Sequence, residues 1–131
     1  MLQIDKMSRQ PVYGQIIESI EKEVLLGYLK EGDQVSSVRD LSKELGINPN
    51  TIQKAYQELD RDGITFSTPG VGTFISPGAT RKIKKKKIEY LLEIEKISGE
   101  LAIAGIEENR TIEAVKQGYK RISEKGVNKN D

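Results

Sequence analysis

Two short helical patterns joined by a tight turn constrain this chain more than any other feature of its sequence. The first pattern follows Ser37 and ends at Gly46, where a left-handed helix cap is expected. The second follows Asn48-Pro49 and ends at Gly63; asparagine is a good N-cap, and proline suits the first helical position. Two helices this close together predict a helix-turn-helix.

The apolar residues of these helices recur at spacings of three and four, which predicts the face that each helix buries. An earlier helix, between Pro11 and Gly27, shows the same pattern. Ser37 and Asp40 also fit a capping box at the start of the second helix. The predicted core residues are Ile16, Ile17, Ile20, Val24, Leu25, Val38, Leu41, Leu45, Ile52, Ala55, Tyr56 and Leu59.

Residues 64–76 have β character in two short runs around a glycine-rich loop, Pro69-Gly70-Val71-Gly72. Two short strands around such a loop predict a hairpin. A hairpin in this place is the wing of a winged helix-turn-helix. We therefore expect a mostly α fold with a small β-hairpin: a winged helix-turn-helix DNA-binding domain over residues 1–77, and a C-terminal helical region over residues 78–131.

Residues 78–131 are predicted to form a two-helix dimerisation region. They open with a basic run at residues 81–87, in which six of the seven residues are lysine or arginine. Two helical patterns follow, the second with Thr111 as its expected N-cap. Their apolar stripes are too small for an independent core, so we expect a second subunit to cover them. The stripes comprise Ile88, Leu91, Leu92, Ile97, Leu101, Ile112, Val115, Tyr119 and Ile122.

Two questions about this C-terminal region stay open at the level of sequence. The basic run at residues 81–87 suits a third DNA contact and suits a solvated linker equally well. The region is too short to enclose a ligand pocket of the usual ~300–1,000 Å³, so we expect no dedicated effector domain. A groove at the dimer interface still leaves room for a small effector.

The chain has no histidine and no cysteine, which excludes whole classes of chemistry. Neither the usual zinc sites nor a Ser-His or Cys-His nucleophilic pair can be built, and the sequence holds no motif of known catalysis. We therefore expect no enzyme activity, no metal and no cofactor. The longest apolar runs are far shorter than a membrane span, so we expect a cytoplasmic protein with no membrane contact.

Charge is divided unevenly between the two regions. Residues 1–77 contain 8 Lys/Arg and 11 Asp/Glu, a net charge of −3, and residues 78–131 contain 13 and 9, a net charge of +4. The two values sum to the +1 of the whole chain. The predicted DNA-binding domain is mildly acidic, so contacts with phosphate must come from a local patch.

The side chains off the apolar stripe of the helix after Asn48 are of the types that read DNA. Asparagine and glutamine pair with adenine, and lysine donates to guanine or to phosphate. The N–H groups at a helix N-terminus also favour a phosphate. In the wing, small residues permit close approach to the DNA backbone, and Thr68 and Thr73 offer hydroxyl groups. The helix residues concerned are Asn50, Thr51, Gln53, Lys54 and Gln57.

Five motifs closely resemble the DNA-binding domain of GntR-type bacterial regulators, in order and at the spacing of that family. They are P-V-Y-x-Q-I from Pro11, G-x-L-x-x-G-D from Gly27, S-V-R-D-L-S-x-x-L-G from Ser37, N-P-N-T-I-x-K-A-Y-x-E-L from Asn48 and G-x-G-T-F from Gly70. The short C-terminal region is similar to the YtrA-type subfamily, whose members have a small two-helix dimerisation region. The resemblance implies a sequence-specific transcription regulator, a repressor, that binds a palindromic operator as a homodimer.

The resemblance also implies roles for single residues. Arg39 matches the family arginine that reaches DNA beside the recognition helix, and Gly72 matches the wing-tip glycine that enters the minor groove. Many members have arginine where Pro49 and Gln53 stand, so we expect weaker, more salt-sensitive binding or a different operator. The predicted DNA-contacting residues are Ser37, Arg39, Asn48, Asn50, Thr51, Gln53, Lys54, Gly70, Gly72 and Thr73.

A function of another class also fits part of the sequence. A winged helix can dock on another protein, with DNA binding incidental, and the acidic balance of residues 1–77 favours that alternative. Preference for a specific DNA duplex separates the two hypotheses.

Overall fold

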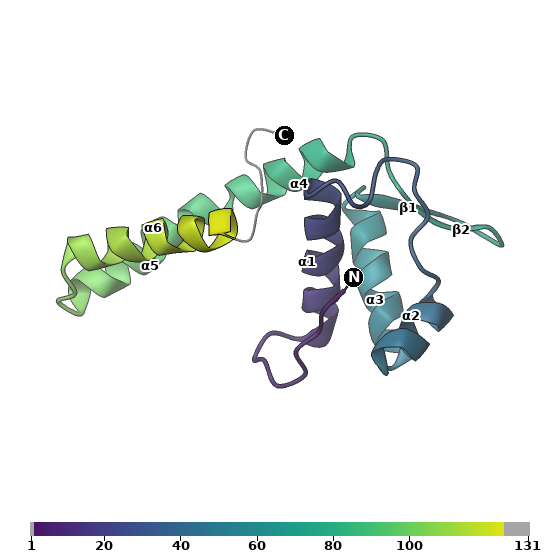
Figure 1. Cartoon of the computed structure of the whole chain (residues 1–131), viewed down its shortest axis with the longest axis horizontal. Coiled ribbons are helices and arrows are strands. Elements are labelled where there is room, and N and C mark those ends of the chain that lie inside the picture. Colours follow the sequence, from purple (N-terminus) through teal and green to yellow (C-terminus); the bar gives the residue numbers. More distant parts are fainter. Residues whose placement is uncertain (1, 125–131) are drawn as a thin grey trace. The chain divides into compact units, whose positions relative to one another are not determined.

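The computed structural model describes residues 2–124 and confirms a mostly helical fold with one two-stranded antiparallel sheet (Figure 1). The chain divides into two compact units, Met1–Lys85 and Lys86–Asp131, here called the winged-helix unit and the C-terminal unit. The elements in chain order are α1 (Val12–Leu25), α2 (Val38–Leu45), α3 (Pro49–Arg61), β1 (Thr65–Thr68), β2 (Gly72–Ile75), α4 (Ala79–Ile88), α5 (Tyr90–Ile103) and α6 (Glu108–Glu124).

The ends of α2 and α3 are fixed by the caps that the sequence predicts. The Ser37 hydroxyl accepts a hydrogen bond from the Asp40 N–H group at 3.0 Å, and Gly46 closes α2 in the left-handed conformation at φ 66°. The Asn48 side-chain oxygen accepts from the Asn50 N–H group at 2.8 Å, with Pro49 as the first residue of α3. Only three residues, Gly46 to Asn48, therefore separate α2 from α3.

The core of the winged-helix unit forms where α1 packs against α3. Ile52, Ala55 and Leu59 of α3 have no exposed surface. Leu25, by contrast, was predicted to be buried but is exposed, because α1 ends at this residue. The other buried hydrophobic side chains are Ile16, Ile17, Ile20, Val24, Val35, Leu41, Tyr56, Ile64, Ile75, Ala79 and Ile83.

Helix α4 adds to this core from beyond the expected boundary at residue 77. Its Ala79 and Ile83 side chains are fully buried, and the compact unit runs to Lys85. The basic run at residues 81–87 lies within α4, so it is helical over its whole length. Lys82 also donates a hydrogen bond to the Gly63 carbonyl at 3.1 Å, which places it at the C-terminal end of α3.

The start of the last helix differs from the prediction that Thr111 caps it. Helix α6 begins at Glu108, so Thr111 lies within its first turns. The reason is local: α5 ends at Ile103, Gly105 at φ 80° reverses the chain just after it, and α6 begins only three residues later. A glutamate at the first helical position is favoured by the helix dipole. None of the helices within residues 2–124 is long and apolar enough to cross a membrane.

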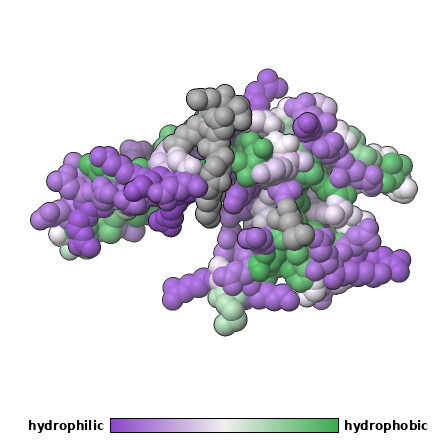
Figure 2. Space-filling view, in the orientation of Figure 1, coloured by the Kyte–Doolittle hydropathy of each residue, from purple (hydrophilic) through white to green (hydrophobic). Residues whose placement is uncertain are grey.

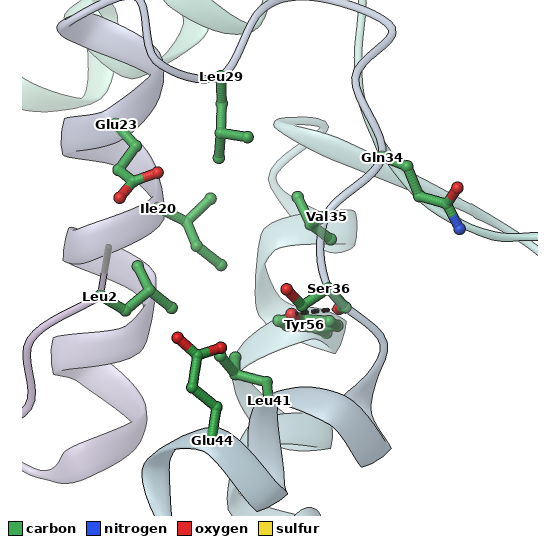
Figure 3. Close-up of a pocket in the computed structure, with 10 residues that line it drawn as sticks. All are labelled: Leu2, Ile20, Glu23, Leu29, Gln34, Val35, Ser36, Leu41, Glu44 and Tyr56. Carbon is green, nitrogen blue, oxygen red and sulfur yellow. Dashed lines mark hydrogen bonds between the residues drawn. The ribbon is translucent and has the colours of Figure 1, made fainter.

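Tyr56 ties α3 to the segment that leads into α2. Its side chain is buried, and its hydroxyl donates to the Ser36 carbonyl at 2.6 Å (Figure 3). It lines a pocket of about 160 Å³ whose wall also includes Glu44. Burial raises the pKa of the Tyr56 hydroxyl to about 12, and the negative charge of Glu44 acts in the same direction.

This raised pKa predicts how stability changes at alkaline pH. The contribution of protonated Tyr56 is complete below pH 10 and is lost as pH rises towards 12, because the unfolded chain ionises first. Tyr56→Phe should be less stable than the wild type by about 0.5–1.5 kcal/mol at pH 8. At pH 11 the difference should move by about 1 kcal/mol in favour of Tyr56→Phe.

Urea unfolding of both proteins at the two pH values measures this difference, and the titration of the lysines cancels between them. The same difference at pH 8 and pH 11 would contradict a raised pKa at Tyr56.

Candidate nucleic-acid interface

The outer face of α3 carries the polar side chains predicted to read DNA. Asn50, Gln53, Lys54 and Gln57 are exposed, and Thr51 is half-buried. The apolar residues of the same helix face the core, because a period of 3.6 residues separates the two sets. The predicted recognition residues therefore lie together on the solvent side of α3, at and after its N-terminal end.

Ser37 and Asn48 are exposed and stand at the N-terminal ends of α2 and α3. Their side-chain oxygens already accept the capping hydrogen bonds. The hydroxyl proton of Ser37 and the NH₂ group of Asn48 are the parts of these side chains that can donate to a phosphate or a base. Arg39 lies in the first turn of α2 and is exposed.

Lys54 makes a contact that the sequence analysis missed. Its ammonium group lies over the ring of Tyr13 on α1, 4.0 Å from the ring centre. This cation–π interaction restricts the side chain without neutralising its charge. Tyr13 belongs to the P-V-Y-x-Q-I motif, and its place in that motif is the sequence feature that could have indicated a role for it near the predicted DNA-binding surface.

The wing is a hairpin with Phe66 paired to Phe74 and Thr68 paired to Gly72. Its turn has the signature of a type II turn: Pro69 second, Gly70 third at φ 75°, and a hydrogen bond from the Val71 N–H group to the Thr68 carbonyl at 3.0 Å.

Gly72, expected at the wing tip, is instead the first residue of β2, and Gly70 occupies the turn. The Thr73 hydroxyl lies 2.8 Å from the Ser67 hydroxyl across the strand pair. Val71 beside the turn is 61% exposed. Figure 2 shows hydrophobic surface on the projecting hairpin, so the tip offers small and apolar groups rather than charged ones.

The outer edge of β2 pairs with the segment that precedes α2, an arrangement the sequence analysis did not anticipate. Gly32 donates to the Ile75 carbonyl at 2.8 Å, Ile75 to the Asp33 carbonyl at 2.9 Å, and Val35 to the Thr73 carbonyl at 2.9 Å. The side chain of Gln34 donates to the Val71 carbonyl at 3.1 Å. Gln34 is among the residues that line the pocket of Tyr56, and in Figure 3 its side chain extends away from Tyr56.

Lys82 of the basic run lies away from the N-terminal end of α3. Lys82 is bonded to Gly63, beyond the C-terminal end of the helix that carries Asn50 at its beginning. Within residues 2–124, no group of three acidic, histidine or cysteine side chains is placed to hold a metal ion. Arg39 on α2 and Lys54 on α3 are the two cationic residues among the predicted DNA-contacting set.

Comparison with known proteins agrees with this arrangement. Residues 12–75 match the bacterial regulatory proteins of the gntR family. The chain is 38% identical over 134 aligned residues to the HTH-type transcriptional repressor YtrA of Bacillus subtilis (strain 168), covering all of both chains.

Solved structures show the same architecture. A transcriptional antiterminator from Listeria monocytogenes EGD-e is similar with a TM-score of 0.73 and 31% identity, over 92% of this chain and 90% of that chain. The AraR DNA-binding domain in complex with operator ORX1 is similar with a TM-score of 0.52 and 27% identity, over 57% of this chain and 93% of that chain.

These matches confirm the resemblance drawn from the five sequence motifs, including the similarity to the YtrA type. The family and the relatives named above consist of transcription regulators, not enzymes. This chain belongs to the GntR family of bacterial regulatory proteins and is a DNA-binding transcription regulator of that family.

Proposed function

We propose that this protein is a sequence-specific repressor that binds a palindromic operator as a homodimer. The observation that carries the proposal is the exposed polar outer face of α3, which is preceded by a helix with an exposed Arg39 and followed directly by a wing. The full-length relative YtrA is itself a repressor, which supports the direction of the regulation.

The side chains of this surface suit a duplex in three ways. Amides on α3 can pair with adenine, and Arg39 and Lys54 can donate to guanine or to phosphate. The N–H groups at the N-terminal ends of α2 and α3 can hold phosphates. The wing turn at Gly70 brings main chain with little side-chain bulk to the DNA backbone. The remaining DNA-contacting residues proposed are Ser37, Asn48, Asn50, Thr51, Gln53, Gly72 and Thr73.

The C-terminal unit supports the homodimer. Helices α5 and α6 contain no buried residue in the single chain, although both carry large apolar side chains. A groove of about 420 Å³ runs between them, lined by Ile94, Ile97 and Val115 among others. In Figure 2 the face of these helices that is visible is mainly hydrophilic, with hydrophobic residues at its edges.

A second copy of the same helix pair is the occupant that we propose for this groove. Apolar faces left uncovered on a soluble chain mark sites of association. Two-fold symmetry would pair each groove with its own equivalent. It would also present two copies of α3 to half-sites about one helical turn apart, which matches a palindromic operator.

The first prediction concerns DNA preference. In a mobility-shift experiment over a series of salt concentrations, the protein should bind duplex DNA from upstream of its own gene more tightly than random duplex. The logarithm of its affinity should fall linearly with the logarithm of the salt concentration, with a slope set by the number of phosphates that it contacts. Equal affinity for both duplexes at low salt would contradict the proposal and favour a winged-helix module that docks on protein.

A second prediction concerns Arg39. Because Arg39 is exposed in the first turn of α2, Arg39→Ala should weaken operator binding by about 1–3 kcal/mol, or about 5- to 150-fold, if it reads a base. Arg61→Ala is the matched control, since Arg61 is exposed in the last turn of α3. Light scattering should give the same mass for both variants. Unchanged operator affinity in Arg39→Ala would show that Arg39 is a surface charge that does not read a base.

The homodimer is tested on α5. Ile97 lines the groove and is 50% exposed in the single chain, so Ile97→Asp would place a charge in an apolar interface. We expect this variant to be monomeric by light scattering and to lose about 10²- to 10⁴-fold in operator affinity, the usual gain from two linked sites. Lys96→Asp, on the neighbouring exposed position, should remain dimeric. A monomeric wild type, or a dimeric Ile97→Asp, would overturn the proposed interface.

A further inference from the structure

Gln34 is an exposed residue whose side chain is nevertheless held in one place. It lies on the connection between α1 and α2, and its Nε2 donates to the Val71 carbonyl at 3.1 Å. Val71 follows the turn at the tip of the wing. A single side chain therefore joins the segment that leads into α2 to the tip of the hairpin.

Gly72 gives a second, independent sign of this contact. Its φ of 144° lies in the region that glycine tolerates and other residues rarely adopt. A Cβ atom on Gly72 would lie 2.2 Å from the Gln34 Nε2 atom, closer than any real contact of that kind. The lack of a side chain at position 72 is what leaves room for the Gln34 amide against the wing.

The main chain around Gln34 explains why its side chain can reach this far. Residues 32–35 pair with the outer edge of β2, and Gln34 itself pairs with Phe74. The last of these main-chain bonds joins Val35 to Thr73. The Gln34 side chain continues the contact along the strand, from Phe74 past Gly72 to the carbonyl of Val71.

We propose that Gln34 is a positioning residue for DNA binding, which fixes the wing tip relative to the N-terminal end of α2. The inference rests on the proposed function, because it assigns the wing a place on the operator. Ser37, the N-cap of α2, lies three positions after Gln34 in the chain, and Arg39 follows in the first turn. A wing held to this segment presents its tip and Arg39 to the duplex in one fixed geometry.

The physical gain lies in pre-organisation. A hairpin that moves freely must lose conformational freedom when it settles on DNA, and that loss reduces the affinity. Gln34 restricts the tip before DNA arrives. Because the bond is exposed and neutral, its net effect is expected to be modest and separable from folding.

The experiment compares Gln34→Met, which keeps the length of the side chain but cannot donate, with Gln34→Glu, which sets a carboxylate against the Val71 carbonyl. Gln3→Met is the matched control, since Gln3 is exposed in the N-terminal segment. Hydrogen exchange in the absence of DNA should become faster over residues 68–73 in both Gln34 variants, with α3 unchanged. The control should match the wild type throughout.

Operator affinity is then measured for the same proteins. Both Gln34 variants should bind about 3- to 10-fold more weakly, the size of one net hydrogen bond, and Gln3→Met should bind as the wild type does. Unchanged exchange in the wing would overturn the contact, and faster exchange with unchanged affinity would overturn its role in binding. A wild type with no operator preference would overturn the proposed function instead, and this is seen before any variant is compared.

Discussion

The packing of α3 against α1 is the interaction on which the rest of the molecule depends. Ile52, Ala55 and Leu59 are completely buried along one stripe of α3, so the rotation of this helix about its axis is fixed. Once that stripe faces inward, the helical period directs Asn50 and Gln53 outward. The polar outer face of α3, proposed to read DNA, is thus a consequence of the core, and a slip in this packing would displace every polar side chain on it.

The segment of residues 32–37 connects the elements that carry the proposed DNA contacts. Its Ser36 carbonyl accepts the hydrogen bond from Tyr56 on α3, and its Gln34 side chain holds the wing at Val71. Its last residue, Ser37, caps α2. Three separate contacts therefore involve one short segment. Together they fix the positions of α2, α3 and the wing relative to one another.

The predictable part of this structure is the part encoded over short distances. The caps at Ser37, Gly46 and Asn48 and the stripe on α3 follow from rules that span a few residues, and all were predicted. Contacts between distant residues were not: Gln34 meets a residue 37 positions away, and nothing local marks it. Ile83 is likewise buried although it lies within a basic run, where the six charged residues around it obscure one apolar position.

The net charge of the winged-helix region affects how tightly this protein can bind DNA. Residues 1–77 carry a net charge of −3, so attraction to the phosphate backbone is weaker than in a strongly basic domain. Affinity must then come from a few well-placed donors, and each is effective only if held in position before binding. The cation–π contact of Lys54 with Tyr13 and the bond of Gln34 to Val71 both restrict groups at this surface. An acidic DNA-binding domain thus gains most from rigidity and from the doubling of its contacts in the proposed homodimer, since neither depends on net charge.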